Sequence, residues 1–396
     1  MKIGIFTDSY RPYTSGVVHS IDLFTRDLTG LGHEVNIFAP SYPKYEKDSR
    51  VFRFASLPAP TNPGYCLAIP FSLRLKPAIK RLRPDIIHVH SPFMLGRLGA
   101  KYARTLGVPL VFTFHTLYDL YIHYVPFGQN LAREITRRYY REFCNGCDLV
   151  ITPTDIIAEH LRSNGILTKI KTVPTGIDIE SFKPGYGRYI HQKHGLPEDA
   201  RVLLCVGRLG QEKNHKFIID VYAGILPAHP DTRLVMVGGG PEESNLKNQA
   251  RELGILENVI FTGTLDRQEV VKYYCSAYLF VFASVTETQG LVLGEAKAAG
   301  VPSVAVSAFG VSEMVKDGED GFLTENSIED FASKLDLLLR DRELRRRMGE
   351  AALENVTALS SKASARRLVG YYEELLAQKV KGDDNSSWIK RHSLRL

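Results

Sequence analysis

Two glutamates, Glu287 and Glu295, have seven residues between them at a point where an apolar strand pattern changes into a helical one. Residues 278–283 have the composition of a buried strand, and the apolar run that begins at 291 is typical of a helix. This spacing puts Glu287 at the end of the strand and Glu295 about one turn or more into the helix. Because loops gather at the carboxyl ends of parallel strands, both carboxylates are expected to face a ligand there.

Two cations, Arg208 and Lys213, follow a second apolar run at 202–206 and so belong to the same predicted edge. Fixed cations stabilise a diphosphate as negative charge develops on it, and arginine can bind its oxygens bidentately. Carboxylates can accept sugar hydroxyls. The four side chains together indicate a sugar-nucleotide site, which we favour over the alternative of a surface Arg and Lys at the beginning of a helix.

Three histidines lie in or directly after predicted strands in the first half of the chain. His115 comes directly after the apolar run 110–114, where it could hydrogen-bond a sugar or a phosphate; the alternative is a capped, structural histidine. His88 and His90 are expected to point to opposite faces of their strand and therefore not to share a metal. On that expectation His90 lines a cleft and His88 is structural.

Short apolar runs alternate with amphipathic stretches along the whole chain, which predicts parallel sheets covered by helices on both faces. The predicted strands are 2–7, 34–39, 85–90, 109–114 and 149–152, then 202–206, 234–237, 259–261, 278–282 and 303–306. The predicted helices are 17–30, 94–106 and 131–143, then 216–225, 244–253, 268–276 and 291–299. A turn-rich region at 173–185 separates the two series, so the sequence predicts two doubly wound domains with a ligand in the cleft between them.

Size and composition agree with this division. The chain has 396 residues, 44% hydrophobic and 24% charged, which is more than one core usually holds. No apolar run is long enough to span a bilayer, and the amino-terminal strand lacks the features of a cleavable signal, which predicts a cytoplasmic protein. The five scattered cysteines do not form a disulfide framework. A net charge of +6 is no argument for a nucleic-acid partner.

With these elements placed, residues 1–375 resemble the retaining GT-B glycosyltransferases of family 4, also called group 1. The resemblance is carried by Glu287 to Glu295, by Arg208 to Lys213, by the Thr-Phe-His-Thr run at 113–116 and by residues 8–18. It implies an α/β GT-B fold with two Rossmann-like domains facing a central cleft. Residues 1–175 would bind the acceptor, 176–365 would bind the nucleotide sugar, and 366–396 would form a C-terminal helix and basic tail.

The resemblance also implies roles. Arg208 and Lys213 would stabilise the diphosphate, Glu287 and His115 would contact the transferred sugar or its phosphate, and Glu295 would accept hydrogen bonds from the ribose. No protein nucleophile and no obligatory metal are implied. Further donor contacts are expected at the turn and first helical residues Thr288, Gln289, Gly290, Leu291 and Val292, at Leu265 against the base, and at Gly16, where relatives often have two glycines and Ser15 replaces one here.

Residues 286–291 and 113–116 resemble the corresponding runs of diacylglycerol glucosyltransferases. Many other members have Gly-Phe-Gly after the first glutamate, where this chain has 288–290 as Thr-Gln-Gly. The implied reaction moves glucose from UDP-glucose to the 3-hydroxyl of 1,2-diacylglycerol and gives an α-linked membrane glycolipid. Transfer of a UDP- or GDP-sugar to phosphatidylinositol or to a soluble sugar is the alternative.

The stretch 71–83 has five cations and no acid, interleaved with apolar residues: Arg74, Lys76, Lys80, Arg81 and Arg83. Such a basic amphipathic segment can lie on an anionic membrane, which predicts a peripheral protein on the cytoplasmic face of the cell membrane. Arginines at 133–141 and Trp388 in the basic tail could add contacts. The alternative is a solvated helix face with its aliphatic residues packed inward.

Two other classes remain as rivals. A dinucleotide-dependent oxidoreductase is disfavoured because no strand leads into G-x-G-x-x-G with an acid about 20 residues later. A non-catalytic peripheral membrane protein would use the basic stretches alone, and turnover of a sugar nucleotide would exclude it.

Overall fold

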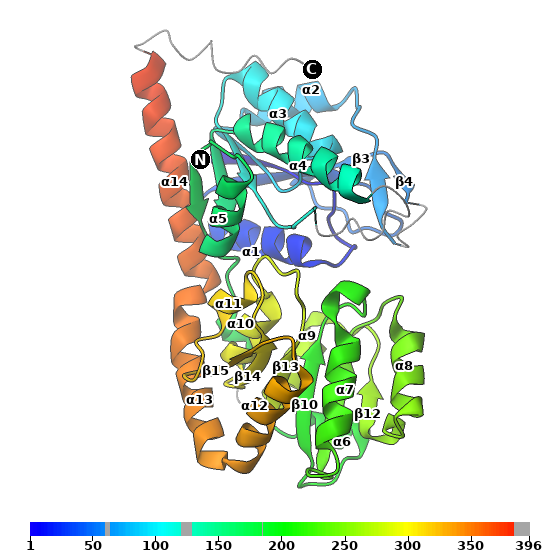
Figure 1. Ribbon diagram of the computed structural model, residues 1–396. Coiled ribbons are helices and arrows are strands. Elements are labelled where there is room, and N and C mark those ends of the chain that lie inside the picture. The colour runs from blue at the N-terminus through cyan, green and yellow to red at the C-terminus, as the bar shows by residue number, and fades with distance from the viewer. Residues whose placement is uncertain (60–63, 120–128, 184, 384–396) are drawn as a thin grey trace. The chain divides into compact units, whose positions relative to one another are not determined.

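The computed structural model describes residues 1–59, 64–119, 129–183 and 185–383 (Figure 1). The chain forms two compact units. The first unit consists of Met1–Gly176 together with Ser361–Leu396, and the second of Ile177–Ser360. The chain therefore leaves the first unit once and returns to it at its C-terminal end.

The first unit is built on a parallel sheet which, among the described residues, has seven strands in the order β3-β2-β1-β6-β7-β8-β9. Its strands are β1 (Lys2–Phe6), β2 (Glu34–Pro40), β3 (Val51–Phe54), β6 (Ile86–Val89), β7 (Leu110–Thr113), β8 (Leu149–Thr152) and β9 (Ile170–Thr172). Its helices are α1 (Gly16–Gly30), α2 (Leu75–Leu82), α3 (Met94–Leu106), α4 (Gln129–Asn145), α5 (Asp155–Ser163) and α14 (Ser361–Asp383). A small antiparallel pair, β4 (Ser56–Pro58) and β5 (Cys66–Ala68), lies outside this sheet.

Helix α14, red in Figure 1, completes the core of the first unit by packing against α1. Leu368 and Tyr372 of α14 are fully buried in one apolar cluster with Ile3 of β1 and Ile21 of α1. Burial of apolar surface of this kind is the main stabilising contribution to a fold. The sequence set residues 366–396 apart as a third segment, whereas the described part of α14 is an integral helix of the first unit.

The second unit contains a parallel sheet with, among the described residues, six strands in the order β12-β11-β10-β13-β14-β15. Its strands are β10 (Arg201–Val206), β11 (Thr232–Val237), β12 (Val259–Phe261), β13 (Leu279–Phe282), β14 (Ser303–Val306) and β15 (Gly321–Thr324). Its α-helices are α6 (Tyr189–His194), α7 (His215–Ile225), α8 (Glu243–Glu252), α9 (Arg267–Cys275), α10 (Leu291–Ala298), α11 (Val311–Met314), α12 (Ile328–Arg340) and α13 (Arg342–Asn355). Short 3-10 turns are η2 (Ile179–Ser181), η3 (Gln211–Lys213), η4 (Leu256–Asn258) and η5 (Val356–Leu359).

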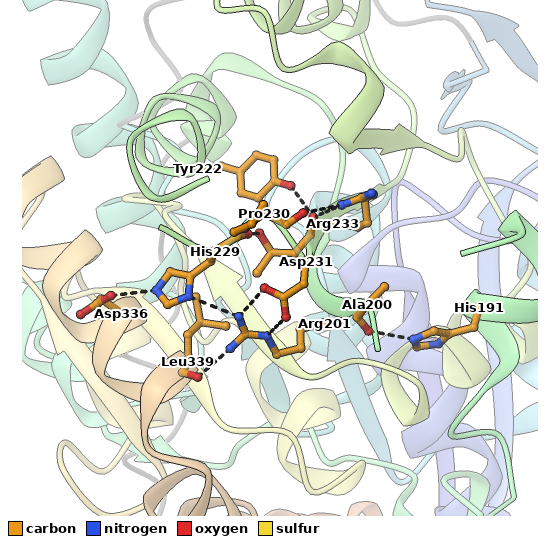
Figure 2. Close-up of polar contacts among 11 residues, drawn as sticks. His191, Ala200, Arg201, Tyr222, His229, Pro230, Asp231, Arg233, Asp336 and Leu339 are labelled. Atoms are coloured by element: carbon orange, nitrogen blue, oxygen red, sulfur yellow. Dashed lines mark hydrogen bonds and ion pairs between the residues drawn. The ribbon is translucent and has the colours of Figure 1, made fainter. Parts of the chain in front are cut away.

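A polar cluster closes the edge of this sheet at which β10 and β11 begin. Figure 2 shows Arg201, the first residue of β10, between Asp231 and His229. Its guanidinium lies 2.5 Å from the Asp231 carboxylate and donates to the Leu339 carbonyl of α12 at 2.6 Å, while His229 bonds Asp336 of α12 at 2.7 Å. These bonds fix α12 to the amino edge of the sheet.

The structure confirms the predicted α/β organisation with two parallel sheets. The strands at 149–152, 259–261 and 303–306 and the helix at 94–106 have the predicted bounds, and the other predicted elements differ by a few residues at their ends. Several short strands were not predicted: β3, β4, β5, β9 and β15. Strands of three or four residues have too few positions to show a periodicity.

Candidate active site

Two loops meet at the carboxyl edge of the second sheet. The first follows β10 and contains η3, and the second runs from the end of β13 to the beginning of α10. Lys213, in the first loop, forms an ion pair with the carboxylate of Glu287 in the second. Ser284 adds a hydrogen bond from its hydroxyl to the Glu212 carbonyl at 3.4 Å. Two residues that the sequence placed at strand ends are therefore in direct contact.

The electrostatics of this pair keep Glu287 ionised. Burial by itself would raise the pKa of Glu287, but the charge of Lys213 and hydrogen bonds from Lys213 and Ser284 outweigh it and lower the pKa below its ordinary value. Both side chains are mostly buried, at 20% exposed for Lys213 and 18% for Glu287. The site thus holds a charged, partly shielded ammonium–carboxylate pair.

The loop after β11 supports the loop after β10. Gly238 has φ +136, and a Cβ atom there would lie 1.9 Å from the Gly207 carbonyl oxygen, so only glycine fits. Leu209 N–H donates to the Gly239 carbonyl at 3.1 Å, and Glu242 N–H donates to the Leu209 carbonyl at 3.0 Å. The glycines at 238–240 therefore serve close packing of two loops beside Arg208.

Arg208 and Leu265, both predicted donor-site residues, lie on loops at this carboxyl edge. Arg208 is exposed and follows β10 by two residues. Leu265 follows β12, is half-buried and packs on the apolar cluster of the second unit. The Gly238 N–H bonds the Gly263 carbonyl at 3.0 Å, which joins the segment before Leu265 to the end of β11.

Helix α10 begins directly after the glutamate loop. Gly290 precedes its first residue in the left-handed conformation with φ +81, which glycine adopts without strain. The N–H groups of Leu291 and Val292 belong to the first turn, where backbone donors have no partner within the helix. Thr288 and Gln289 complete the turn, and Gln289 is buried. A polar or anionic ligand group could accept hydrogen bonds at this end of α10.

Glu295, in the second turn of α10, is buried at 5% exposure and forms an ion pair with Arg267, the first residue of α9. The guanidinium of Arg267 also lies over the ring of Phe182, 5.8 Å from the centroid. Arg267 was not among the predicted site residues. Its position two residues after Leu265 was the available signal, because the segment after β12 was already predicted to face the base.

His88, His90 and His115 form one column of rings in the first unit. Successive ring centroids are 4.3 Å and 5.1 Å apart, and Nδ1 of His90 lies 2.8 Å from Nε2 of His115. The expectation that His88 and His90 point to opposite faces was wrong. Side chains on a strand alternate with a period of two, so residues two apart share a face.

Gly16 is the first residue of α1, whereas the sequence predicted a helix that begins one residue later, at 17. Ser15 is the N-cap of this helix, and its hydroxyl accepts a hydrogen bond from Val18 N–H at 3.3 Å. The serine that replaces a second glycine therefore stabilises the helix end. Gly16 itself is exposed.

The basic stretch at 71–83 contains α2, and its side chains divide into two groups. Leu75, Ile79 and Leu82 are buried and hold α2 on the first unit. Phe71 and Leu73, just before the helix, are 71% and 83% exposed. The five cations, Arg74, Lys76, Lys80, Arg81 and Arg83, are all exposed. Inward packing thus accounts for the aliphatic residues of the helix but not for Phe71 and Leu73.

Other predicted membrane contacts are placed only in part. Arg137 of α4 bonds the buried carboxylate of Asp119 at 3.0 Å, which is a structural role. Trp388 lies outside the described residues. Among the residues that the structure describes, no helix is long and apolar enough to cross a membrane, and no group of His, Cys, Asp or Glu could hold a metal ion.

Two family models and several known proteins match this chain. Residues 14–181 match the family model described as Glycosyltransferase Family 4, and residues 188–355 match the model described as Glycosyl transferases group 1. An alpha-monoglucosyldiacylglycerol synthase of Streptococcus pneumoniae is 34% identical over 332 residues, covering 82% of this chain and 75% of the relative. The chain belongs to the group 1, family 4 glycosyltransferases.

Two further relatives show that the family includes members with the same name and members with a different one. An alpha-monoglucosyldiacylglycerol synthase of Acholeplasma laidlawii is 31% identical over 82% of this chain and 85% of its own length. A GDP-mannose-dependent alpha-mannosyltransferase of Corynebacterium glutamicum is 27% identical over 95% of this chain and 90% of its own.

Solved structures show the fold. Sucrose-phosphate synthase of Thermosynechococcus elongatus superimposes with a TM-score of 0.78 at 20% identity, covering 95% of this chain and 99% of that one. Anabaena HepE in complex with UDP-glucose gives 0.73 at 18% identity, covering 96% and 99%. The predicted GT-B fold and the predicted glycosyltransferase class are confirmed, which argues against a dinucleotide-dependent oxidoreductase.

Proposed function

We propose that the protein transfers glucose from UDP-glucose to the 3-hydroxyl of 1,2-diacylglycerol with retention, giving an α-glucosyl diacylglycerol. The observation that carries the donor half is the contact between Lys213 and Glu287 at the carboxyl edge of the second sheet. This edge is where open parallel sheets bind nucleotides. A cation and a carboxylate there suit a ligand that has both a diphosphate and sugar hydroxyls.

In the proposed reaction the bond between the anomeric carbon and the β-phosphate oxygen breaks as the acceptor oxygen bonds the same carbon. Lys213 and Arg208 stabilise the negative charge that develops on the departing diphosphate. The proton of the acceptor hydroxyl passes to a diphosphate oxygen on the same face of the sugar. The products are UDP and the glycolipid, and we assign no step to a protein nucleophile or to a metal.

The remaining donor contacts are proposed by position. Glu287 and His115 would hydrogen-bond the sugar or its phosphate, and Glu295 would accept from the ribose hydroxyls. Leu265 would lie against the base. The backbone of residues 288–292 at the beginning of α10, together with Gly16 at the beginning of α1, would approach the sugar and phosphates.

The acceptor half rests on two observations. Two relatives above 30% identity are named as alpha-monoglucosyldiacylglycerol synthases. In the first unit, exposed apolar side chains accompany the exposed cations of α2, with Phe71 and Leu73 just before Arg74. A surface with aromatic or aliphatic groups beside cations can bind an anionic lipid bilayer, which is where a diacylglycerol acceptor is found.

A different donor and acceptor form the second candidate. The GDP-mannose-dependent relative matches almost the whole chain, although at 27% identity. Transfer from GDP-mannose would use the same cation–carboxylate site because GDP-mannose also contains a diphosphate. Transfer to phosphatidylinositol or to a soluble sugar would use that site too, because the donor is still a nucleotide diphosphate sugar.

A donor and acceptor matrix separates these candidates. The purified full chain is incubated in mixed micelles with UDP-glucose, UDP-galactose or GDP-mannose, each with diacylglycerol, phosphatidylinositol or a soluble glucoside, and the products are identified by mass. UDP-glucose with diacylglycerol should give the fastest product formation. Faster product formation by any other pair would overturn the proposed donor or acceptor.

A further inference from the structure

His90 occupies a position in the first unit that none of the donor-site assignments uses. It follows the last residue of β6, is 1% exposed, and its ring lies between those of His88 and His115. Its Nδ1 is 2.8 Å from Nε2 of His115, a hydrogen-bond distance, and the planes of the two rings differ by 19°. The orientation of His115 is therefore coupled to His90.

Hydrogen bonds hold the ring of His88, at the other end of this row of three histidines, in one orientation. His88 has hydroxyl partners on both ring nitrogens: Tyr372 at 2.6 Å from Nδ1 and Thr113 at 2.7 Å from Nε2. Tyr372 belongs to α14 and is fully buried. Since His88 cannot rotate without losing both bonds, it presents a fixed ring to His90, with the two ring planes tilted by 32°.

The hydrogen-bond partners of His90 determine which of its two ring nitrogens carries the proton. Its Nε2 is buried and has no hydrogen-bond partner among the described residues. A neutral imidazole has one donor nitrogen and one acceptor nitrogen. A proton on Nε2 would leave a buried donor unpaired, which is rarer and costlier than an under-satisfied acceptor. The proton therefore belongs on Nδ1, which donates to Nε2 of His115.

This donation sets the state of His115. If Nε2 accepts from His90, the neutral His115 ring carries its own proton on Nδ1. Burial lowers the pKa of His115 to about 4 and also lowers that of His90, which agrees with neutral rings near neutral pH. Because Nε2 of His115 already accepts from His90, it is poorly placed to act as a base.

We propose that His90 is a positioning residue that holds His115 in one ring orientation and as the Nδ1–H tautomer. The inference rests on the proposed function, in which His115 contacts the sugar or phosphate of the donor. His115 then acts on a donor oxygen as a fixed hydrogen-bond donor, and His90 acts only through His115. The anchor through His88 makes α14 part of this arrangement.

Two variants of similar shape test this. His90→Asn retains an N–H near the position of Nδ1, whereas His90→Leu has a similar volume and no donor. His90→Leu should lower kcat about tenfold, the order expected for losing one positioned hydrogen bond, and His90→Asn should remain within about threefold of wild type. Thermal unfolding of both variants checks that each is folded.

The tautomer is measured directly by ¹⁵N NMR of histidine-labelled full chain at neutral pH, with the His115 signals assigned from a His115→Gln sample. Wild type and His90→Asn should show a protonated Nδ1 and an unprotonated Nε2 in His115, and His90→Leu should lose this fixed pattern. A proton on Nε2 of His115 in wild type overturns the proposal, as does wild-type turnover by folded His90→Leu. Equal losses in the Asn and Leu variants overturn the donor role of His90.

The two proposals fail separately. If wild type transfers no glucose to diacylglycerol, the proposed function fails while the His115 tautomer is still measured. If transfer occurs and the tautomer pattern is absent, the role of His90 fails alone.

Discussion

Lys213 and Glu287 are 74 positions apart in the chain, yet the ammonium of one forms an ion pair with the carboxylate of the other. The parallel arrangement of β10 and β13, which are neighbours in the second sheet, brings their following loops together. In the proposed donor site the diphosphate competes with Glu287 for the same ammonium. Glu287 therefore holds the Lys213 ammonium in place at the site before the donor binds.

Arg267 should matter for donor affinity although it was not among the predicted site residues. We expect Arg267→Ala to raise the KM for UDP-glucose about three- to tenfold, because Glu295 loses a charge-assisted hydrogen bond that fixes its carboxylate. Arg251→Ala, on the exposed side of α8, is the control and should leave KM unchanged. Initial rates at varied donor concentration give both values, and an unchanged KM in Arg267→Ala would remove Glu295 from the ribose site.

The cations of α2 should contribute to membrane binding. Each cation near an anionic surface adds about 1 kcal/mol, so Lys80→Ala with Arg81→Ala should weaken partitioning onto vesicles rich in phosphatidylglycerol about thirtyfold. The control pair Arg342→Ala with Arg347→Ala removes the same charge from an exposed part of α13. Co-sedimentation measures the partitioning; equal effects of the two pairs would mean that net charge, and not α2, is responsible.

The buried ion pair between Lys297 of α10 and Asp320 should stabilise the second unit. Their side chains are 5% and 0% exposed and 2.5 Å apart, and Asp320 also accepts from Lys316 N–H at 3.0 Å and Asn355 at 2.8 Å. Asp320→Ala leaves a buried ammonium unpaired, so we expect a loss of about 3 to 5 kcal/mol in the free energy of unfolding.

Urea unfolding measures the effect of Asp320→Ala. Glu319→Ala, which removes the neighbouring exposed carboxylate, should shift the unfolding midpoint far less. Similar midpoints for the two variants would show that the buried pair contributes little.

The stability of the protein should fall in acid partly through Glu287. Its pKa is lower in the folded protein than its ordinary value of 4.5, so its contribution is present above that value and is lost as the pH falls through the folded pKa. Glu287→Gln should therefore be less sensitive to acid than wild type, whereas Glu252→Gln, at an exposed position, should behave like wild type. Unfolding free energies measured at pH values from above 4.5 down through the folded pKa of Glu287 test the difference. Parallel curves of unfolding free energy against pH for wild type and Glu287→Gln would contradict it.

The carboxyl-edge residues could be predicted because the strand and helix rhythm is local. Once 202–206 and 278–283 are taken as parallel strands, Lys213 and Glu287 must follow at one edge. The partner of Glu295 could not be predicted, because the contact with Arg267 depends on how α9 and α10 pack. Such a contact has no periodic signal in the sequence.

Two features of the first unit were also not predicted: the contact between His88 and His90, and the place of α14. The wrong face assignment of His88 and His90 hid the contact between their rings, which the two-residue period of a strand predicts. Membership of α14 in the first unit depends on burial of Tyr372, which is 284 positions from its partner His88. No local pattern indicates a contact over that distance.

Lys213→Ala tests the central claim most directly. The measurement is the single-turnover rate of glucose transfer to diacylglycerol at saturating UDP-glucose, with circular dichroism to check the fold. Loss of the cation that stabilises the departing diphosphate should lower this rate about 100- to 1000-fold while the protein stays folded. A folded Lys213→Ala protein that transfers glucose at nearly the wild-type rate would contradict the assignment of this cation–carboxylate pair to the donor site.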